Sequence, residues 1–185
     1  MAVELVYETH AITEDNEAGI ATGWLPGRLS EQGRLGAADL GQRRRDTGLA
    51  AVFTSDLRRS VETAQIAFAG TDLPLFQDRR LRECDYGELN GSPADAVDAV
   101  RARHVDEPFP GGQSYRQVID ATREFLADLA GGYAGRRVLL IAHSANRLAL
   151  DCLLAGASIE EALTVPFAWQ PGWYYTLPDT WPAVP

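Results

Sequence analysis

Two histidines and one arginine follow apolar stretches of the chain within a few residues. His10 follows the first such stretch, and His143 follows the most apolar one, residues 137–142. Arg59 comes shortly after the stretch of residues 50–54. A neutral imidazole can act as a nucleophile or move a proton, and a guanidinium can bind a phosphate or carboxylate through two parallel hydrogen bonds. Together these residue types suit a reaction on a small anion.

The elements that would position these side chains follow from the apolar pattern. Ser30 and Ser114 can cap helices that run to about residues 46 and 129, and Ser55 or Asp56 can cap a third, to about residue 68. We expect an α/β fold, a three-layer sandwich in which a mostly parallel sheet carries helices on both faces. Ligands bind beyond the carboxyl ends of such strands, where both histidines fall. The expected strands are residues 3–7, 50–54, 73–76, 137–142 and 173–177, the expected loop is 8–29, and the other expected helices are 93–104, 146–154 and 159–163.

The composition is that of one globular domain over residues 1–185, with 45% hydrophobic and 23% charged residues. The net charge of -9 argues against a nucleic-acid partner. No apolar run is long enough for a membrane helix, and the first residues do not read as a signal peptide, so we expect a cytoplasmic protein without a membrane partner. The chain has no lysine, which excludes lysine-dependent chemistry. We expect no cofactor and no metal, since the histidines lack the close spacing of zinc sites.

Five motifs in collinear order carry a resemblance to a known family. Residues 55–64, SDLRRSVETA, are similar to the pattern S-x-L-x-R-A-x-Q-T-A. Residues 81–91, LRECDYGELNG, are similar to L-R-E-x-x-(F/Y)-G-x-(W/L)-x-G. The other three are Thr9-His10-Ala11, where the family has Arg-His-Gly, residues 109–114, and Ala142-His143-Ser144. The chain therefore resembles the histidine phosphatase superfamily, which has the phosphoglycerate-mutase-like fold.

The resemblance implies a metal-independent phosphatase-type hydrolase that acts on a small phosphorylated substrate. His10 would attack phosphorus and form a phosphohistidine, and its other ring nitrogen would donate to a backbone carbonyl. Arg59 and His143 would donate hydrogen bonds to the phosphoryl oxygens. Glu83 would protonate the leaving oxygen and later deprotonate water. The other implied phosphate-binding residues are Thr9, Asn16, Thr22, Gly23 and Ser144.

Thr9 stands where the family has an arginine. The replacement removes up to two charge-assisted hydrogen bonds of about 1.5–3 kcal/mol each. Three explanations are open. Arg28, Arg82 or Arg147 could take over the position, the substrate could carry less charge there, or the protein could bind a phosphorylated ligand without turnover. Because the other site residues are present, we favour an active enzyme.

Within the family, the alternative to a hydrolase is a phosphoglycerate-mutase-type phosphotransferase. A mutase must hold its intermediate and exclude water, whereas the region between Glu83 and His143 is compact, which favours hydrolysis. The sequence does not indicate the oligomeric state. Residues 12–28 and 88–112 are the expected specificity loops, and Trp169 is expected in the core or against the sheet. The residues that could form an apolar wall at the site are Trp24, Tyr86, Phe109 and Tyr115.

Overall fold

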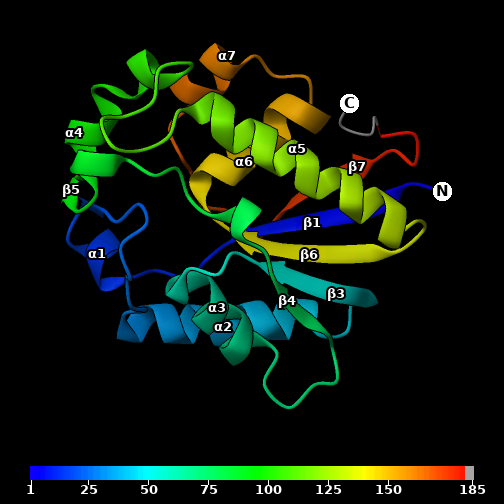
Figure 1. The fold of residues 1–185 in the computed structure, drawn as a ribbon. Helices are drawn as coiled ribbons and strands as arrows, with labels where there is room; N and C mark the ends of the chain where they lie inside the picture. Colours follow the sequence, from blue (N-terminus) through cyan, green and yellow to red (C-terminus); the bar gives the residue numbers. More distant parts are fainter. Residues whose placement is uncertain (182–185) are drawn as a thin grey trace.

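The computed structural model describes residues 1–181. The strands of its central sheet are β1 (Val3–Thr9), β3 (Leu49–Thr54), β4 (Leu75–Gln77), β6 (Arg137–Ala142) and β7 (Trp173–Leu177). Their order in space is β4-β3-β6-β1-β7 (Figure 1). All neighbours are parallel except β7, which runs antiparallel to β1 at one edge. The expected α/β fold with a mostly parallel sheet is confirmed.

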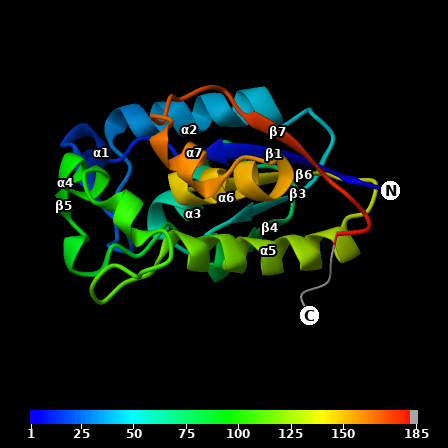
Figure 2. The same cartoon turned by 90° about the horizontal axis from the view of Figure 1, so that it is seen from above.

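Four helices form the two outer layers. Helices α2 (Glu31–Arg44) and α3 (Arg58–Ala67) cover one face of the sheet, and α5 (Tyr115–Gly132) and α6 (Ser144–Leu154) cover the other (Figures 1 and 2). None of the helices within residues 1–181 is long and apolar enough to span a bilayer. The three layers are those expected for a parallel sheet whose crossovers are helical.

The strands contribute side chains to two apolar cores, one on each face of the sheet, because successive residues of a strand point to opposite faces. Leu5 and Tyr7 of β1 join the core beneath α5 and α6, where they meet Phe125. Val6 joins the core beneath α2 and α3 with Leu40. All residues of β6 after the first are buried, which explains its continuous apolar run.

Serine caps begin two long helices where the sequence predicts them. Ser30 and Ser114 each accept a hydrogen bond from the backbone N–H three residues further on. The predicted cap of α3 by Ser55 or Asp56 is wrong. Leu57 directly precedes the helix and, being apolar, makes no side-chain cap bond. The Ser55 hydroxyl lies 2.7 Å from Nε2 of His143 and accepts from the backbone N–H of Leu57 at 3.3 Å, one residue before the helix begins.

Shorter elements surround the carboxyl ends of the strands. They are α1 (Glu14–Glu17), β2 (Ile20–Ala21), η1 (Arg79–Leu81), η2 (Gly87–Leu89), β5 (Ser92–Pro93), α4 (Ala94–Asp98), η3 (Arg101–His104) and α7 (Ile159–Thr164). The predicted loop 8–29 therefore contains α1 and β2, and β2 pairs with β5. The helix predicted over 93–104 is interrupted, because Val100 and Arg103 donate to carbonyls three positions back rather than four.

Candidate active site

His10 lies just beyond the carboxyl end of β1. Its backbone N–H donates to the carbonyl oxygen of Ala142 in β6 at 2.9 Å. The ring Nδ1 lies 2.8 Å from the carbonyl oxygen of Ala11. Because a carbonyl oxygen can only accept, Nδ1 carries the proton and Nε2 holds the available lone pair. The predicted bond from the histidine ring to a backbone carbonyl is confirmed.

His143 lies at the carboxyl end of β6 and is fully buried. The pairing of Thr9 with Ala142 in neighbouring strands brings the two histidines together, with ring centroids 5.1 Å apart and ring planes at 53°. The ring Nε2 of His143 lies 2.7 Å from the hydroxyl oxygen of Ser55. Its Nδ1 has no hydrogen-bond partner within residues 1–181. A buried polar atom without a partner is unfavourable, so this nitrogen keeps an unused hydrogen-bonding capacity next to the His10 ring.

Arg59 enters from the first turn of α3 and is only 2% exposed. Its Nε donates to Nε2 of His10 at 3.3 Å. Its terminal nitrogens donate to the carbonyl oxygens of Gly23 at 2.8 Å and Leu25 at 3.3 Å. Gly23 has a φ of +55°, and a Cβ there would lie 1.8 Å from the side-chain oxygen of Asn90. A glycine is thus needed in the loop that directs the guanidinium toward the imidazole.

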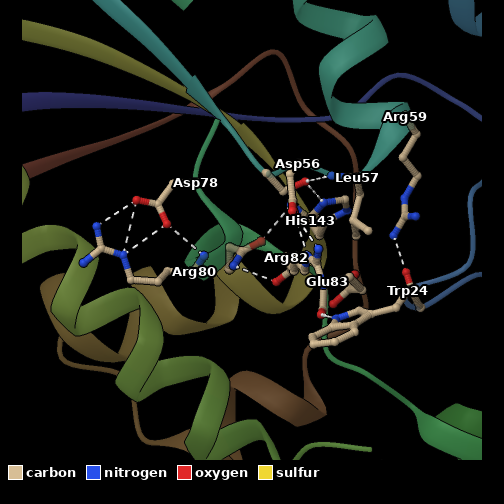
Figure 3. A network of polar contacts seen from close by, with 12 residues as sticks. Trp24, Asp56, Leu57, Arg59, Asp78, Arg80, Arg82, Glu83 and His143 are labelled. Atoms are coloured by element: carbon tan, nitrogen blue, oxygen red, sulfur yellow. Dashed lines mark hydrogen bonds and ion pairs between the residues drawn. The ribbon is translucent and has the colours of Figure 1, made fainter. Parts of the chain in front are cut away.

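Glu83 lies after η1 and is 7% exposed. Its Oε1 accepts hydrogen bonds from the backbone N–H groups of Cys84 at 2.9 Å and Ala145 at 3.2 Å. Its Oε2 accepts from the Ser144 hydroxyl at 3.0 Å. Its carbonyl oxygen accepts from the Trp24 indole at 2.7 Å (Figure 3). These bonds hold the carboxylate at the start of α6, on the wall of the cavity that contains His10.

Both imidazoles are neutral in this site. Burial, and after it the Arg59 charge, lower the pKa of His10 from 6.5 to about 3. Burial, Arg59 and His10 likewise hold the pKa of His143 well below its ordinary value. A lowered pKa in the folded state means that the imidazole stays unprotonated as long as the pH is above that value. At neutral pH, His10 therefore presents an uncharged nucleophile that a phosphate dianion does not repel.

None of the three arginines considered as replacements at Thr9 takes that role in this structure. Each is held by a carboxylate, at nitrogen–oxygen distances of 2.6 to 3.1 Å. The pairs are Arg28 with Glu14, Arg82 with Asp56 (Figure 3), and Arg147 with Asp151. Of the three explanations left open by the sequence, replacement by one of these arginines would require breaking the ion pair that each makes in this structure.

The other residues predicted to bind phosphate fall into two groups. Those that line the cavity beside His10 are Thr9, Asn16 and Ser144. Thr22 and Gly23 are not among its lining residues. The hydroxyl of Thr22 donates to Asp15 at 2.9 Å, and Gly23 offers a carbonyl oxygen to Arg59. The structure places Thr22 and Gly23 in the loop that positions Arg59.

The cavity beside His10 has a volume of about 1190 Å³. The predicted apolar wall is wrong. Trp24 does not line the cavity, and Tyr86, Phe109 and Tyr115 belong to a buried core, because apolar partners from α5 and α6 cover their rings. The expectation for Trp169 is also wrong, since it is 61% exposed. The larger apolar residues of the cavity lining are Ile12, Leu40, Val105, Leu163, Pro166, Phe167 and Trp169.

Two residues that the sequence analysis did not assign to the site make hydrogen bonds that position it. Ser55 contacts the His143 ring. Thr63 accepts a hydrogen bond from the backbone N–H of Ala11 at 3.0 Å and donates its own proton to the Arg59 carbonyl oxygen at 2.7 Å. Both belong to the motif of residues 55–64, so that motif was the signal that could have found them. Within residues 1–181, no group of three or more His, Cys, Asp or Glu side chains is placed to hold a metal ion.

The family model and the related sequences that match this chain point to the same family. The family model described as "Histidine phosphatase superfamily (branch 1)" matches residues 9–171. A 2,3-bisphosphoglycerate-dependent phosphoglycerate mutase of Methylobacterium sp. (strain 4-46) is 32% identical over 180 residues, covering 88% of this chain and 84% of the relative. Phosphoserine phosphatase 1 of Hydrogenobacter thermophilus is 28% identical over 168 residues, covering 86% of this chain and 79% of the relative.

Solved structures share the fold over most of the chain. Bacillus stearothermophilus YhfR has a TM-score of 0.81 at 27% identity, covering 92% of this chain and 88% of its own. A mycobacterial glucosyl-3-phosphoglycerate phosphatase in complex with VO3 has a TM-score of 0.77 at 28% identity, covering 88% of this chain and 87% of its own. The similar proteins thus include both mutases and phosphatases.

Proposed function

Since the chain belongs to the histidine phosphatase superfamily (branch 1), we propose that it is a phosphomonoesterase that hydrolyses a small phosphorylated metabolite through a phosphohistidine on His10. The observation that carries the proposal is the contact between Nε2 of His10 and Nε of Arg59 at 3.3 Å, beside a second imidazole. A neutral nucleophile next to a fixed cation suits attack on a dianionic phosphoryl group. The proposed reaction needs no metal and no cofactor.

The first step transfers the phosphoryl group to the protein. A phosphoryl oxygen replaces Nε2 of His10 as the acceptor of the Arg59 Nε–H bond, which frees the Nε2 lone pair. Nε2 then attacks phosphorus while the bond between phosphorus and the alcohol oxygen breaks. The bond from Nδ1–H to the Ala11 carbonyl orients the ring and stabilises the positive charge that it gains. Arg59 and His143 donate to the non-bridging oxygens.

The second step returns the site to its starting state. Glu83, a carboxylate in the free site, takes up one proton as the anionic substrate binds beside it, and it gives that proton to the departing alkoxide. As a carboxylate it then takes a proton from water, the water oxygen attacks phosphorus, and the bond to Nε2 breaks with its electron pair returning to the ring. Inorganic phosphate leaves and the proton is released with it, so Glu83 is a carboxylate again and no net proton remains on the chain. The Ser144 hydroxyl holds Oε2 of Glu83 at 3.0 Å for both transfers.

Two other functions each have one observation in their favour. Relatives between 30% and 34% identical are named as phosphoglycerate mutases, and a mutase would pass the phosphoryl group to a second hydroxyl instead of water. Thr9 reduces the positive charge at the site, which favours a protein that binds a phosphorylated ligand without turnover. The acidic side chains on the cavity wall support hydrolysis over a mutase that takes a bisphosphate.

The test is phosphate release from a panel of monoesters: an aryl phosphate and sugar, glycerate and nucleotide phosphates. We expect turnover by the wild-type protein and none above background by His10→Ala. A phosphorylated peptide containing residue 10 should be detected by mass spectrometry after rapid alkaline quenching. Thermal stabilisation by these compounds without release would indicate a binding protein. Phosphorylation by a bisphosphate, followed by transfer to a glycerate, would indicate a mutase.

A further inference from the structure

The cavity beside His10 is far larger than a phosphoryl group needs. Its volume of about 1190 Å³ lies above the range of about 300–1,000 Å³ that is usual for small-molecule sites. Part of its wall comes from the segment that follows α7, through Pro166, Phe167 and Trp169. Another part of the wall comes from α2. The space therefore accommodates an alcohol portion much larger than that of a glycerate.

Three exposed large apolar side chains gather in this one cavity. Ile12 is 47% exposed, Phe167 46% and Trp169 61%, and all three line it. Single exposed apolar side chains are ordinary, but a cluster of them beside a reaction centre marks a surface that a ligand covers. Phe167 packs against Trp173 with ring centroids 6.0 Å apart, and the Arg43 guanidinium lies 5.8 Å from the Trp169 ring centroid. These contacts pack Phe167 and Trp169 against neighbouring side chains.

The charged groups around the cavity are mostly acidic. Five carboxylates line it against two guanidinium groups: Glu8, Asp39, Glu83, Asp98 and Glu160 against Arg43 and Arg101. Arg101 pairs with Asp98 at 3.3 Å, and Arg43 pairs with Glu8 at 3.2 Å. Glu8 also binds Arg44, which leaves one surplus positive charge there. Asp39 and Glu160 are exposed on the cavity wall and form no ion pair within residues 1–181, so a second acidic group on a substrate meets repulsion where it comes close to either carboxylate.

We propose that the alcohol portion of the substrate is bulky, apolar and free of acidic groups, and that it packs against Phe167 and Trp169. This inference rests on the proposed phosphatase function, because the cavity matters to catalysis only when His10 receives the phosphoryl group. The substrate class is thus a monoester of a hydrophobic alcohol, which differs from the bisphosphate in the name of the related mutases.

The size of the alcohol is tested with two primary alkyl monoesters, phenylbutyl phosphate and ethyl phosphate, whose leaving alkoxides have similar basicity. We expect kcat/KM to be at least about tenfold higher for phenylbutyl phosphate, since an aromatic group gains roughly that factor on burial. In the double variant Phe167→Ala, Trp169→Ala the ratio of the two kcat/KM values should fall about tenfold. Phe76→Ala is the matched control, because Phe76 is 45% exposed on the far edge strand β4 and should leave the ratio unchanged.

The charge of the alcohol is tested with butyl phosphate and phosphorylated hydroxybutyrate, which differ by one carboxylate. The wild-type protein should prefer butyl phosphate. The double variant Asp39→Asn, Glu160→Gln should raise the relative kcat/KM for the acidic substrate about fourfold, because both carboxylates are exposed and solvent screens each repulsion to about twofold. A preference of the wild-type protein for the acidic substrate would overturn the inference.

The outcomes separate this inference from the proposed function. Turnover of all four esters with equal kcat/KM, unaffected by loss of Phe167 and Trp169, would overturn the substrate class and leave the phosphatase function intact. Absence of turnover above His10→Ala would overturn the phosphatase function. In that case calorimetry with His10→Ala still decides the ligand class. Phenylbutyl phosphate must bind at least about tenfold more tightly than ethyl phosphate, and equal binding would refute the apolar site.

Discussion

Replacement of Arg59 by methionine removes the guanidinium and keeps an unbranched side chain of similar reach. In the proposed transition state, Arg59 donates to phosphoryl oxygens through Nε–H and through one terminal N–H that the carbonyl oxygens of Gly23 and Leu25 leave unused. Each such bond contributes about 1.5–3 kcal/mol. Their loss therefore costs about 3–6 kcal/mol. Since about 1.4 kcal/mol corresponds to a tenfold change in rate, we expect kcat/KM to fall between about a hundredfold and about ten-thousandfold.

The same variant changes the acid side of the pH profile. Burial is the first cause of the low pKa of His10, about 3 against an ordinary 6.5, and the Arg59 charge is the second. Without that charge the pKa rises, although burial still holds it below the ordinary value. A protonated imidazole has no lone pair, so activity requires a pH above the folded-state pKa. Arg59→Met should therefore lose activity between about pH 6.5 and pH 3, where the wild-type His10 stays neutral.

Arg58→Met is the matched control. Arg58 is the next residue in the same helical turn, its side chain is 56% exposed, and its only ion pair is with Glu62 at 3.7 Å among the described residues. Exposed pairs of this kind contribute little, so this variant should keep its rate within about twofold. The assay measures kcat/KM for an aryl phosphate at several pH values and compares Arg59→Met with Arg58→Met at each pH. Thermal melts of both variants confirm that they are folded. A loss of less than about tenfold in Arg59→Met relative to Arg58→Met would refute the placement of Arg59 at the phosphoryl group.

Two further substitutions test other parts of the structure. Thr9→Arg should raise the affinity for vanadate about tenfold, because it restores at least one charge-assisted hydrogen bond. Calorimetry measures this affinity, with Thr9→Val as the control. Equal affinities of the two variants would show that the position needs no cation. Gly172→Ala should lower the free energy of unfolding in urea by about 2–4 kcal/mol, because φ is +95° and the new Cβ would lie 2.0 Å from the Arg44 guanidinium that binds buried Glu8. Gly156 has a φ of +77° and no atom within 4 Å of an added Cβ. Gly156→Ala should therefore lower the free energy of unfolding only by the backbone strain that it introduces, about 1–2 kcal/mol. Equal decreases in the two variants would contradict the role of Arg44.

The placement of the two histidines could be predicted because it depends on few choices. An apolar run that ends in a polar residue predicts a buried strand with that residue at its carboxyl end. His10 and His143 both have this context, and parallel strands put their carboxyl ends at one edge. The serine caps at Ser30 and Ser114 follow from equally local chemistry. Features that depend on residues nearby in the sequence, such as strand ends and helix caps, can thus be predicted from local patterns.

The arginine partners and the apolar wall depend on distant neighbours and could not be predicted. Arg82 and Arg59 look alike in sequence, but Asp56, 26 positions away, binds Arg82, whereas Arg59 meets His10. Phe109 lies in a polar loop, yet its ring stacks on His104 with centroids 4.0 Å apart and is buried. Trp169 looks like a core residue and is exposed in the cavity. In each case the decisive contact comes from another part of the chain.

The position of β1 between β6 and β7 affects how the protein can be made. The Tyr7 hydroxyl donates to the His143 carbonyl oxygen, 136 positions further along the chain. The ribosome therefore makes the part of the site that contains His10 early and the part that contains His143 late. A chain still on the ribosome carries the nucleophile but lacks the second imidazole until β6 has emerged. Until then, β1 has two unpaired edges and an apolar sequence, which invite association with other chains. Chaperone binding to the nascent chain should therefore centre on β1, and a chain that stops before β6 should be inactive.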